Sequence, residues 1–177
     1  MKDRPLWSVP LHADEVPENG RDVTCVADAA VRAEIAKVAG LVALPRLEAK
    51  FHIRRQGEDR LAVTGTVSAT VEQTCVVTLD PLVNEISERV DLVFDATLKD
   101  LPPSREDDEE PSDTFDTLEP LVDGTIDLGV IATDFLLLGI DPYPRKPDAA
   151  FEPPASPPDE SPFAALAALK KERPGKG

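Results

Sequence analysis

The sequence predicts an α+β fold in which an antiparallel β-sheet packs with two main helices. Apolar residues recur with period two from Leu47 to Val71 and again over 85–94, which indicates three or more strands. Helical spacing of apolar residues occurs on both sides of this region. The short connections favour antiparallel pairing, because parallel neighbours need a long crossover. Such a sheet either stays open or closes into a barrel-like form.

The first helix is predicted between Asp28 and Gly40. Asp28 can cap its N-terminus and Gly40 is a natural stop. Val31, Ile35 and Val38 recur at i, i+4 and i+7, so we expect them to face the core. Residues 1–22, which contain three prolines, are expected to form an extended lead-in with a short edge strand over 6–11.

A long hairpin is predicted after this helix, with one face buried. Leu47, Ala49, Phe51 and Ile53 alternate with polar residues, residues 56–59 form a turn, and the alternation resumes from Leu61 to Val71. A third strand is expected over Glu85–Phe94, where the apolar face consists of Ile86, Val90, Leu92 and Phe94.

The second helix is predicted over residues 128–140 and is almost wholly apolar, which is typical of a core helix. Asp123 and Gly124 suit a turn before a short strand, and Asp127 is placed to cap the helix. The stretch does not fit a calcium loop, which needs alternating acidic residues and a terminal glutamate. The prolines that follow Asp141 end the helix.

Two regions are expected to lie outside the core. Residues 100–119 carry nine acidic residues and one basic residue, so we predict a disordered acidic loop. A single domain is therefore expected over residues 1–146, followed by a proline-rich linker at 147–160. A short helix is predicted at 161–173, where Ser161 caps it and Phe163, Leu166 and Leu169 share one side. This candidate docking helix could pack on its own domain or on a partner.

The net charge of −15 excludes the overall electrostatic field of a nucleic-acid-binding protein, which needs clustered Lys and Arg. Any RNA contact must be local or relayed through a protein. The candidate contact residues are Arg54, Arg55 and Arg60 around the hairpin turn, and Arg145 and Lys146 after the second helix.

No catalytic or metal-binding constellation is predicted. The two cysteines, Cys25 and Cys75, are interpreted as buried structural thiols, and neither His12 nor His52 lies in a triad pattern. A thiol-dependent or RNA-processing enzyme is the less favoured alternative. No cofactor, membrane contact or small-molecule substrate is expected, and the absence of an apolar signal segment favours the cytoplasm.

Two motifs carry a resemblance to a known family. The first runs from Gln73 to Pro81, and the second spans 123–128 and continues over 138–146. Together they resemble the YceD-like family, the large ribosomal RNA subunit accumulation proteins, in its alphaproteobacterial form. The matching motif residues, interpreted as architectural, are Cys75, Thr78, Leu79, Pro81, Asp123, Gly124, Ile126, Asp127, Leu128, Pro142, Tyr143 and Pro144.

The resemblance also implies a metal site in many relatives, with paired cysteines at the first motif and again near the end of the domain. Here Cys75 is present, but Thr78 takes the second position, and residues 142–145 contain no cysteine. One thiolate cannot build a site that normally needs four ligands. We therefore expect packing to hold this corner.

The function implied by the resemblance is that of a non-enzymatic accessory factor for the large ribosomal subunit. Such a factor supports the accumulation or processing of 23S ribosomal RNA. Its expected partners are large-subunit ribosomal RNA or precursor particles, contacted directly or through a protein. A dedicated chaperone for one basic ribosomal protein is the alternative.

Overall fold

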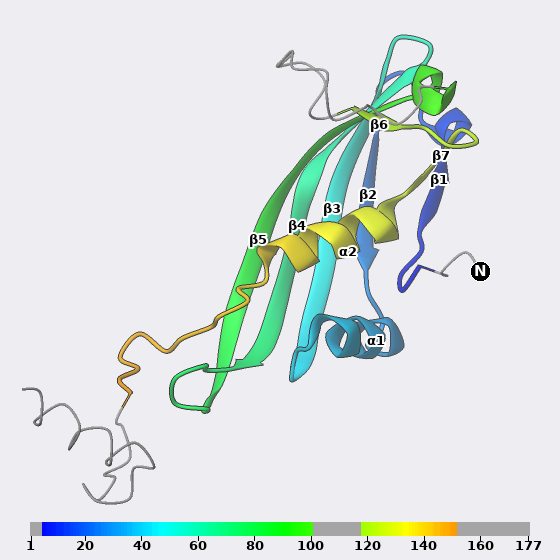
Figure 1. The fold of residues 1–177 in the computed structure, drawn as a ribbon. Coiled ribbons are helices and arrows are strands. Elements are labelled where there is room, and N and C mark those ends of the chain that lie inside the picture. The colour runs from blue at the N-terminus through cyan, green and yellow to red at the C-terminus, as the bar shows by residue number, and fades with distance from the viewer. Residues whose placement is uncertain (1–4, 101–117, 152–177) are drawn as a thin grey trace, which may run out of the picture.

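A computed structural model describes residues 5–100 and 118–151, without the side chains of residues 99 and 100. Within these ranges the chain forms one five-stranded sheet, one two-stranded sheet and two helices (Figure 1). The α+β prediction is confirmed. Most of the predicted acidic loop, most of the proline-rich linker and the whole predicted C-terminal helix lie outside the described residues.

The large sheet contains β2 (Arg21–Val26), β3 (Ala43–Gln56), β4 (Arg60–Thr74), β5 (Pro81–Asp95) and β6 (Leu118–Pro120), in that order across the sheet. The first four are antiparallel neighbours, whereas β6 runs parallel to β5. The sheet is open, so closure into a barrel is wrong. Its edge strands are short, with six residues in β2 and three in β6.

The predicted hairpin is confirmed, and its strands are longer than predicted. Leu47, Phe51, Ile53, Val63 and Val67 face the core and are buried. The third predicted strand is likewise confirmed, with Ile86 and Val90 buried. A Cβ at Gly65, in the middle of β4, would collide with the carbonyl of Lys50 on β3, so a glycine is required there.

Two strands depart from the sequence prediction. β2 begins at Arg21, inside the segment expected to be an extended lead-in, and pairs along its whole length with β3. β6 begins at Leu118, inside the expected acidic loop. Both are short edge strands with few apolar residues, so the period-two pattern that identifies a half-buried strand is weak in them.

Helix α1 (Ala29–Ala39) forms where predicted. The Asp28 carboxylate accepts a hydrogen bond from the N–H of Val31 at 2.8 Å, and Gly40 follows in the left-handed conformation with φ of 67°. Ile35 and Ala36 are buried, but Val38 is 62% exposed. The expectation that Val38 faces the core is therefore wrong. Small alanine side chains let α1 lie close to β3, and its contact face is centred on Ile35.

Helix α2 (Leu128–Gly139) lies across one face of the large sheet (Figure 1). Leu128, Ile131, Ala132 and Leu136 are buried in the same core as the strands. The helix is not buried all round, however, because Leu137 and Leu138 are exposed. The prediction of a wholly buried core helix is thus wrong for one side, which no described residue covers.

The lead-in forms a second small sheet. β1 (Pro10–His12) pairs with β7 (Thr125–Asp127), next to the start of α2, rather than with the edge of the large sheet. Trp7, Leu11 and Ile126 bury their side chains in the common core. Single turns of 3-10 helix follow β1 at Ala13–Glu15 and β5 at Ala96–Asp100.

Candidate functional site at the Cys75 corner

The first family motif forms a tight turn at the end of β4, which leads into β5. The N–H of Cys75 donates to the carbonyl of Asp80 at 2.8 Å, and the N–H of Leu79 donates to the carbonyl of Cys75 at 2.9 Å. Leu79 has a φ of 62°, a left-handed conformation that is uncommon outside glycine. The turn therefore presents the Leu79 side chain to solvent, where it is 76% exposed.

The segment after α2 closes onto this turn, so the two distant halves of the family motif meet. The N–H of Val76 donates to the carbonyl of Pro144 at 3.0 Å, and the Lys146 ammonium lies 2.9 Å from the carboxylate of Asp80. Gln73 fixes the start of the segment by donating to the carbonyl of Asp141 at 2.8 Å. We call the residues 73–81 and 141–146 the Cys75 corner.

The Cys75 thiol lies at the centre of the corner and is fully buried, as predicted. The N–H groups of Thr78 and Lys146 both point at its sulfur, each at 3.5 Å. Hydrogen bonds from the Thr78 hydroxyl, then from the N–H groups of Thr78 and Lys146, lower the pKa of the thiol to about 6. The sulfur therefore acts as a hydrogen-bond acceptor that joins the two segments.

The residues of the corner do not supply the ligands that a metal site needs. The Cys75 sulfur receives main-chain N–H groups from both segments, but Thr78 stands where a second thiol would be needed and residues 142–145 supply none. Among residues 5–100 and 118–151, no group of three or more His, Cys, Asp or Glu could hold a metal ion. A tetrahedral zinc site does not fit this donor set.

Several large apolar side chains at and near the corner are exposed. Val76, Leu79, Val83 and Tyr143 are 43%, 76%, 62% and 71% exposed. Arg145 is exposed and lines a small pocket together with Glu85 and Asp141, whereas Pro144 is buried and holds the segment in place. Exposed apolar side chains that form a contiguous patch are typical of interaction sites. The sequence analysis did not identify these exposed side chains, because it treated Leu79 only as an architectural motif residue and assigned no role to Val76 or Val83.

The other family motif lies at the opposite end of α2. Asp123 and Gly124, with φ of 53° and 65°, form a turn closed by the N–H of Thr125 and the carbonyl of Val122 at 3.0 Å. Asp127 accepts hydrogen bonds from the N–H groups of Gly129 and Val130, which confirms the predicted cap.

Asp127 also ties α2 to the lead-in. Its carboxylate accepts from the N–H of Val9 at 2.8 Å and from the Ser8 hydroxyl at 2.6 Å. Ile126 and Leu128, its neighbours, are buried. This half of the motif positions α2, whose other end leads into the Cys75 corner.

The three arginines around the hairpin turn do not form one basic surface. Arg55 donates to the carbonyls of Val16 and Ala13, and thereby fastens the lead-in to β3. Arg60 lies 2.6 Å from the carboxylate of Asp95, which is only 2% exposed. Arg54 is exposed on the face of the sheet opposite α2, and Arg60 is exposed too, but its charge is paired with that of Asp95.

Charges of both signs alternate on that opposite face. One row across the sheet joins Thr24, Lys50, Thr66 and Arg89, and the next row joins Asp22, His52, Thr64 and Asp91. Lys50 is paired with Glu48 at 3.0 Å, and His52 lies 2.7 Å from Asp22. The face therefore lacks the concentrated positive potential that binding to phosphate requires.

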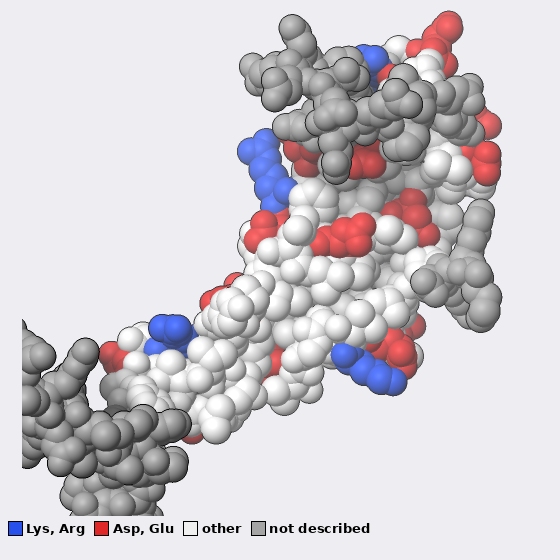
Figure 2. Space-filling model, in the orientation of Figure 1, with Lys and Arg blue, Asp and Glu red and all other residues white. Residues whose placement is uncertain are grey.

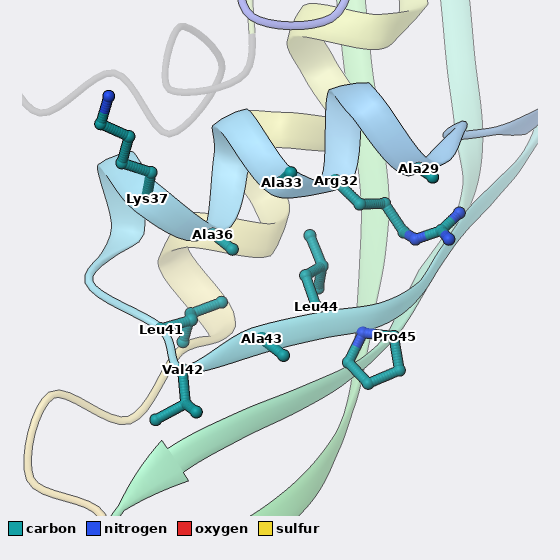
Figure 3. Close-up of a pocket in the computed structure, with 10 residues that line it drawn as sticks. All are labelled: Ala29, Arg32, Ala33, Ala36, Lys37, Leu41, Val42, Ala43, Leu44 and Pro45. Atoms are coloured by element: carbon teal, nitrogen blue, oxygen red, sulfur yellow. The ribbon is translucent and has the colours of Figure 1, made fainter.

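A shallow pocket of about 430 Å³ lies between α1 and the start of β3 (Figure 3). Alanine and other apolar side chains form most of its wall. Arg32 donates to the carbonyl of Ala27, while Lys37 points away from the cavity. No acid, histidine or cysteine lines it, so it contains no pair of groups suited to acid–base or nucleophilic chemistry.

The fold and the corner define an α+β protein in which an open sheet is crossed by one helix, and the segment after that helix closes onto the turn between β4 and β5. A family model described as "Large ribosomal RNA subunit accumulation protein YceD" matches residues 63–170, more than half of the chain. The protein therefore belongs to the YceD family. The family description implies a role in the accumulation of large-subunit ribosomal RNA and names no reaction.

The match differs in extent from the motifs that carry the resemblance in the sequence, which lie between residues 73 and 146. It starts within β4 and continues to Lys170. No curated protein and no solved structure matched the chain significantly. None of the described helices is long and apolar enough to cross a membrane.

Proposed function

We propose that this protein is a non-catalytic accessory factor in biogenesis of the large ribosomal subunit. It acts in the cytoplasm and supports the accumulation or processing of 23S ribosomal RNA by binding RNA or a ribosomal protein. The observation that carries this proposal is the family match over residues 63–170, together with the description of that family.

The Cys75 corner is the surface that we assign to partner binding. Leu79 and Tyr143 offer exposed apolar side chains, and exposed Arg145, two residues after Tyr143 in the chain, supplies a positive charge. The turn and the segment after α2 hold each other through main-chain hydrogen bonds, so this surface is preorganised. A preorganised surface loses less conformational entropy on binding.

The proposal is tested first in cells that are depleted of the protein. We expect the ratio of 23S to 16S ribosomal RNA to fall, and full-length protein supplied from a plasmid to restore it. The protein should also co-sediment with large-subunit precursors, and less so at higher salt if charged contacts contribute. A normal ratio in depleted cells would contradict the proposed function.

The assignment to the corner is tested by complementation with charge-reversed variants. Arg145→Glu should impair rescue, whereas Lys37→Glu on the exposed side of α1 makes the same change in charge away from the corner and should rescue fully. Arg54→Glu tests the hairpin arginine separately. Equal rescue by Arg145→Glu and Lys37→Glu would remove the corner from the proposal and leave the family role intact.

A chaperone for one basic ribosomal protein is the second candidate function. It is favoured by the net charge of −15, of which −8 falls between residues 100 and 119. Exposed Glu119 continues this charge onto β6. The test replaces the acidic residues 106–110 by their amides in the full chain. Loss of a co-purifying basic protein with retained binding to RNA would favour the chaperone, and unchanged capture would exclude this use of the segment.

A further inference from the structure

The uncovered side of α2 borders an apolar groove. It has a volume of about 470 Å³ and lies between α2, β5 and the short strands β6 and β7. Its apolar wall includes Leu92, Phe94, Val122, Val130, Phe135 and Leu138. Leu138 is 79% exposed and Val122 57% exposed. In Figure 2 the surface on this side is largely uncharged, with acidic residues at intervals along it.

We propose that this groove is the docking site of the chain's own C-terminal segment, residues 161–173. The side chains that enter the groove are Phe163, Leu166 and Leu169. The segment runs antiparallel to α2, with Phe163 near Leu138 and its basic end near Glu119.

The segment is about as long as α2, which forms one wall of the groove. Nine to eleven residues of helix, from Phe163 onward, extend about 14–17 Å at 1.5 Å per residue. The twelve residues of α2 extend about 18 Å on the same scale. Phe163, Leu166 and Leu169 recur at intervals of three, so they lie along one side of such a helix. A three-turn helix is marginal in water and needs a docking surface to form fully.

The tether is long enough to return to the groove. The tether begins at the end of the sheet where β5 starts. Lys146 is hydrogen-bonded to Cys75, and Cys75 follows Thr74, which pairs with Pro81 at the start of β5. Leu92 lies eleven residues along β5 from Pro81, which is about 36 Å at 3.3 Å per residue. The seventeen residues from Lys146 to Phe163 can span about 53 Å as polyproline II. The segment therefore reaches any part of the groove.

The charges at the rim of the groove are opposite in sign to those at the end of this segment. Glu119 and Asp134 line the groove, and desolvation raises the pKa of Asp134 above its ordinary value. The segment ends in Lys170, Lys171 and Arg173, which would offset these carboxylates. Leu101 and Phe115, which also lie outside the described residues, belong to a strongly acidic stretch that the rim would repel.

The family match gives independent support, because it continues through the proline-rich stretch to residue 170. The segment that contains Phe163, Leu166 and Leu169 is thus matched together with β4, β5 and α2. The inference does not depend on the proposed function, and its test uses purified protein without ribosomes.

The test measures hydrogen exchange of the tail amides in the full-length chain. We expect amides between residues 164 and 171 to exchange at least about tenfold more slowly than in a synthetic peptide of residues 152–177. Protection should be independent of protein concentration. Leu166→Asp and Leu138→Asp should each abolish it, the first from the segment and the second from the exposed rim of the groove.

Ala168→Asp is the matched control for the segment. It introduces the same charge two positions from Leu166, on the opposite side of a helix, and should leave protection unchanged. Equal exchange in the chain and the peptide would overturn the proposal. Protection that Leu138→Asp does not alter would place the segment elsewhere, and protection lost on dilution would assign the groove to a second copy. Either result also overturns it.

Discussion

The main-chain N–H of Lys146 donates to the sulfur of Cys75 at 3.5 Å, across 71 positions of sequence. This contact fastens the segment that leaves α2 to the turn that leaves β4. It gives a physical reason for a family motif in two distant parts, because each part contributes main-chain groups to one corner. The same relationship makes the ionisation of Cys75 a measure of whether the corner is assembled.

Replacement of Cys75 by serine should remove a pH dependence of folding. The thiol pKa is about 6 in the folded protein and near 8.5 in an unfolded chain. Between these values the unfolded state binds the proton, so the free energy of unfolding of the native protein should rise with pH. This contribution is absent below pH 6 and complete above about pH 9.

Urea denaturation at half-unit steps from pH 6 to 8.5 measures the effect. Cys75→Ser should flatten the rise, and Cys25→Ser should retain it, because burial raises the pKa of Cys25 and keeps that thiol neutral throughout. Parallel curves for the native protein and Cys75→Ser would show that the two segments do not direct their N–H groups at the sulfur.

Asp127→Ala should destabilise the protein more than Asp28→Ala. Both residues cap helices, and loss of a cap costs about 1 kcal/mol. Asp127 also accepts hydrogen bonds from Ser8 and Val9, so we expect a total of about 2 kcal/mol for its removal. Denaturant titrations of the two variants provide the comparison. Equal losses would mean that the link from α2 to the lead-in contributes nothing.

The neighbouring arginines Arg54 and Arg55 should differ sharply in their effect on stability. Arg55→Ala removes the hydrogen bond to the carbonyl of Val16 and one of the two that the carbonyl of Ala13 accepts, and should cost about 2 kcal/mol. Arg54→Ala removes an exposed side chain and should stay within about 0.5 kcal/mol. Thermal unfolding of both variants checks this, and a destabilised Arg54→Ala would contradict the positions assigned to the two side chains.

Asp95 should make the protein sensitive to acid. Hydrogen bonds from the hydroxyl and N–H of Thr97, followed by the ion pair with Arg60, lower the pKa of Asp95 to about 2. Its contribution to stability is present above the ordinary pKa near 4 and is lost as the pH falls towards 2. Asp95→Asn should therefore weaken the fall in stability over this interval, as followed by circular dichroism. An unchanged acid transition would contradict this role.

The sequence patterns predicted the elements that have a regular spacing of apolar residues or a clear helix cap. The β3–β4 hairpin shows strict alternation, and both helices have acidic caps, so these elements were recognisable from local chemistry. Strands β2 and β6 were not, because a short edge strand is defined by its neighbour and not by its own periodicity. The uncovered side of α2 was missed for a related reason, since Leu137 and Leu138 suit a buried helix equally well.

The candidate site was predictable only in part. The motif residues around Cys75 and Asp127 were identified by resemblance, and Arg145 and Lys146 by their charge. Their assembly depends on contacts such as that between Val76 and Pro144, which join segments far apart in the chain. Arg55 and Arg60 were assigned to a partner because the sequence cannot show that nearby carbonyls and a buried carboxylate already bind them.

The chain leaves β5 at Asp95 and returns as β6, where Leu118 is the partner of Val93. Both ends of the intervening stretch are therefore anchored at one edge of the sheet. Since loop-closure entropy grows only logarithmically, doubling the length of such an insert costs only about 0.6 kcal/mol. Natural variants of this protein can consequently lengthen or shorten the stretch, and retune its charge, with little penalty to the rest of the architecture.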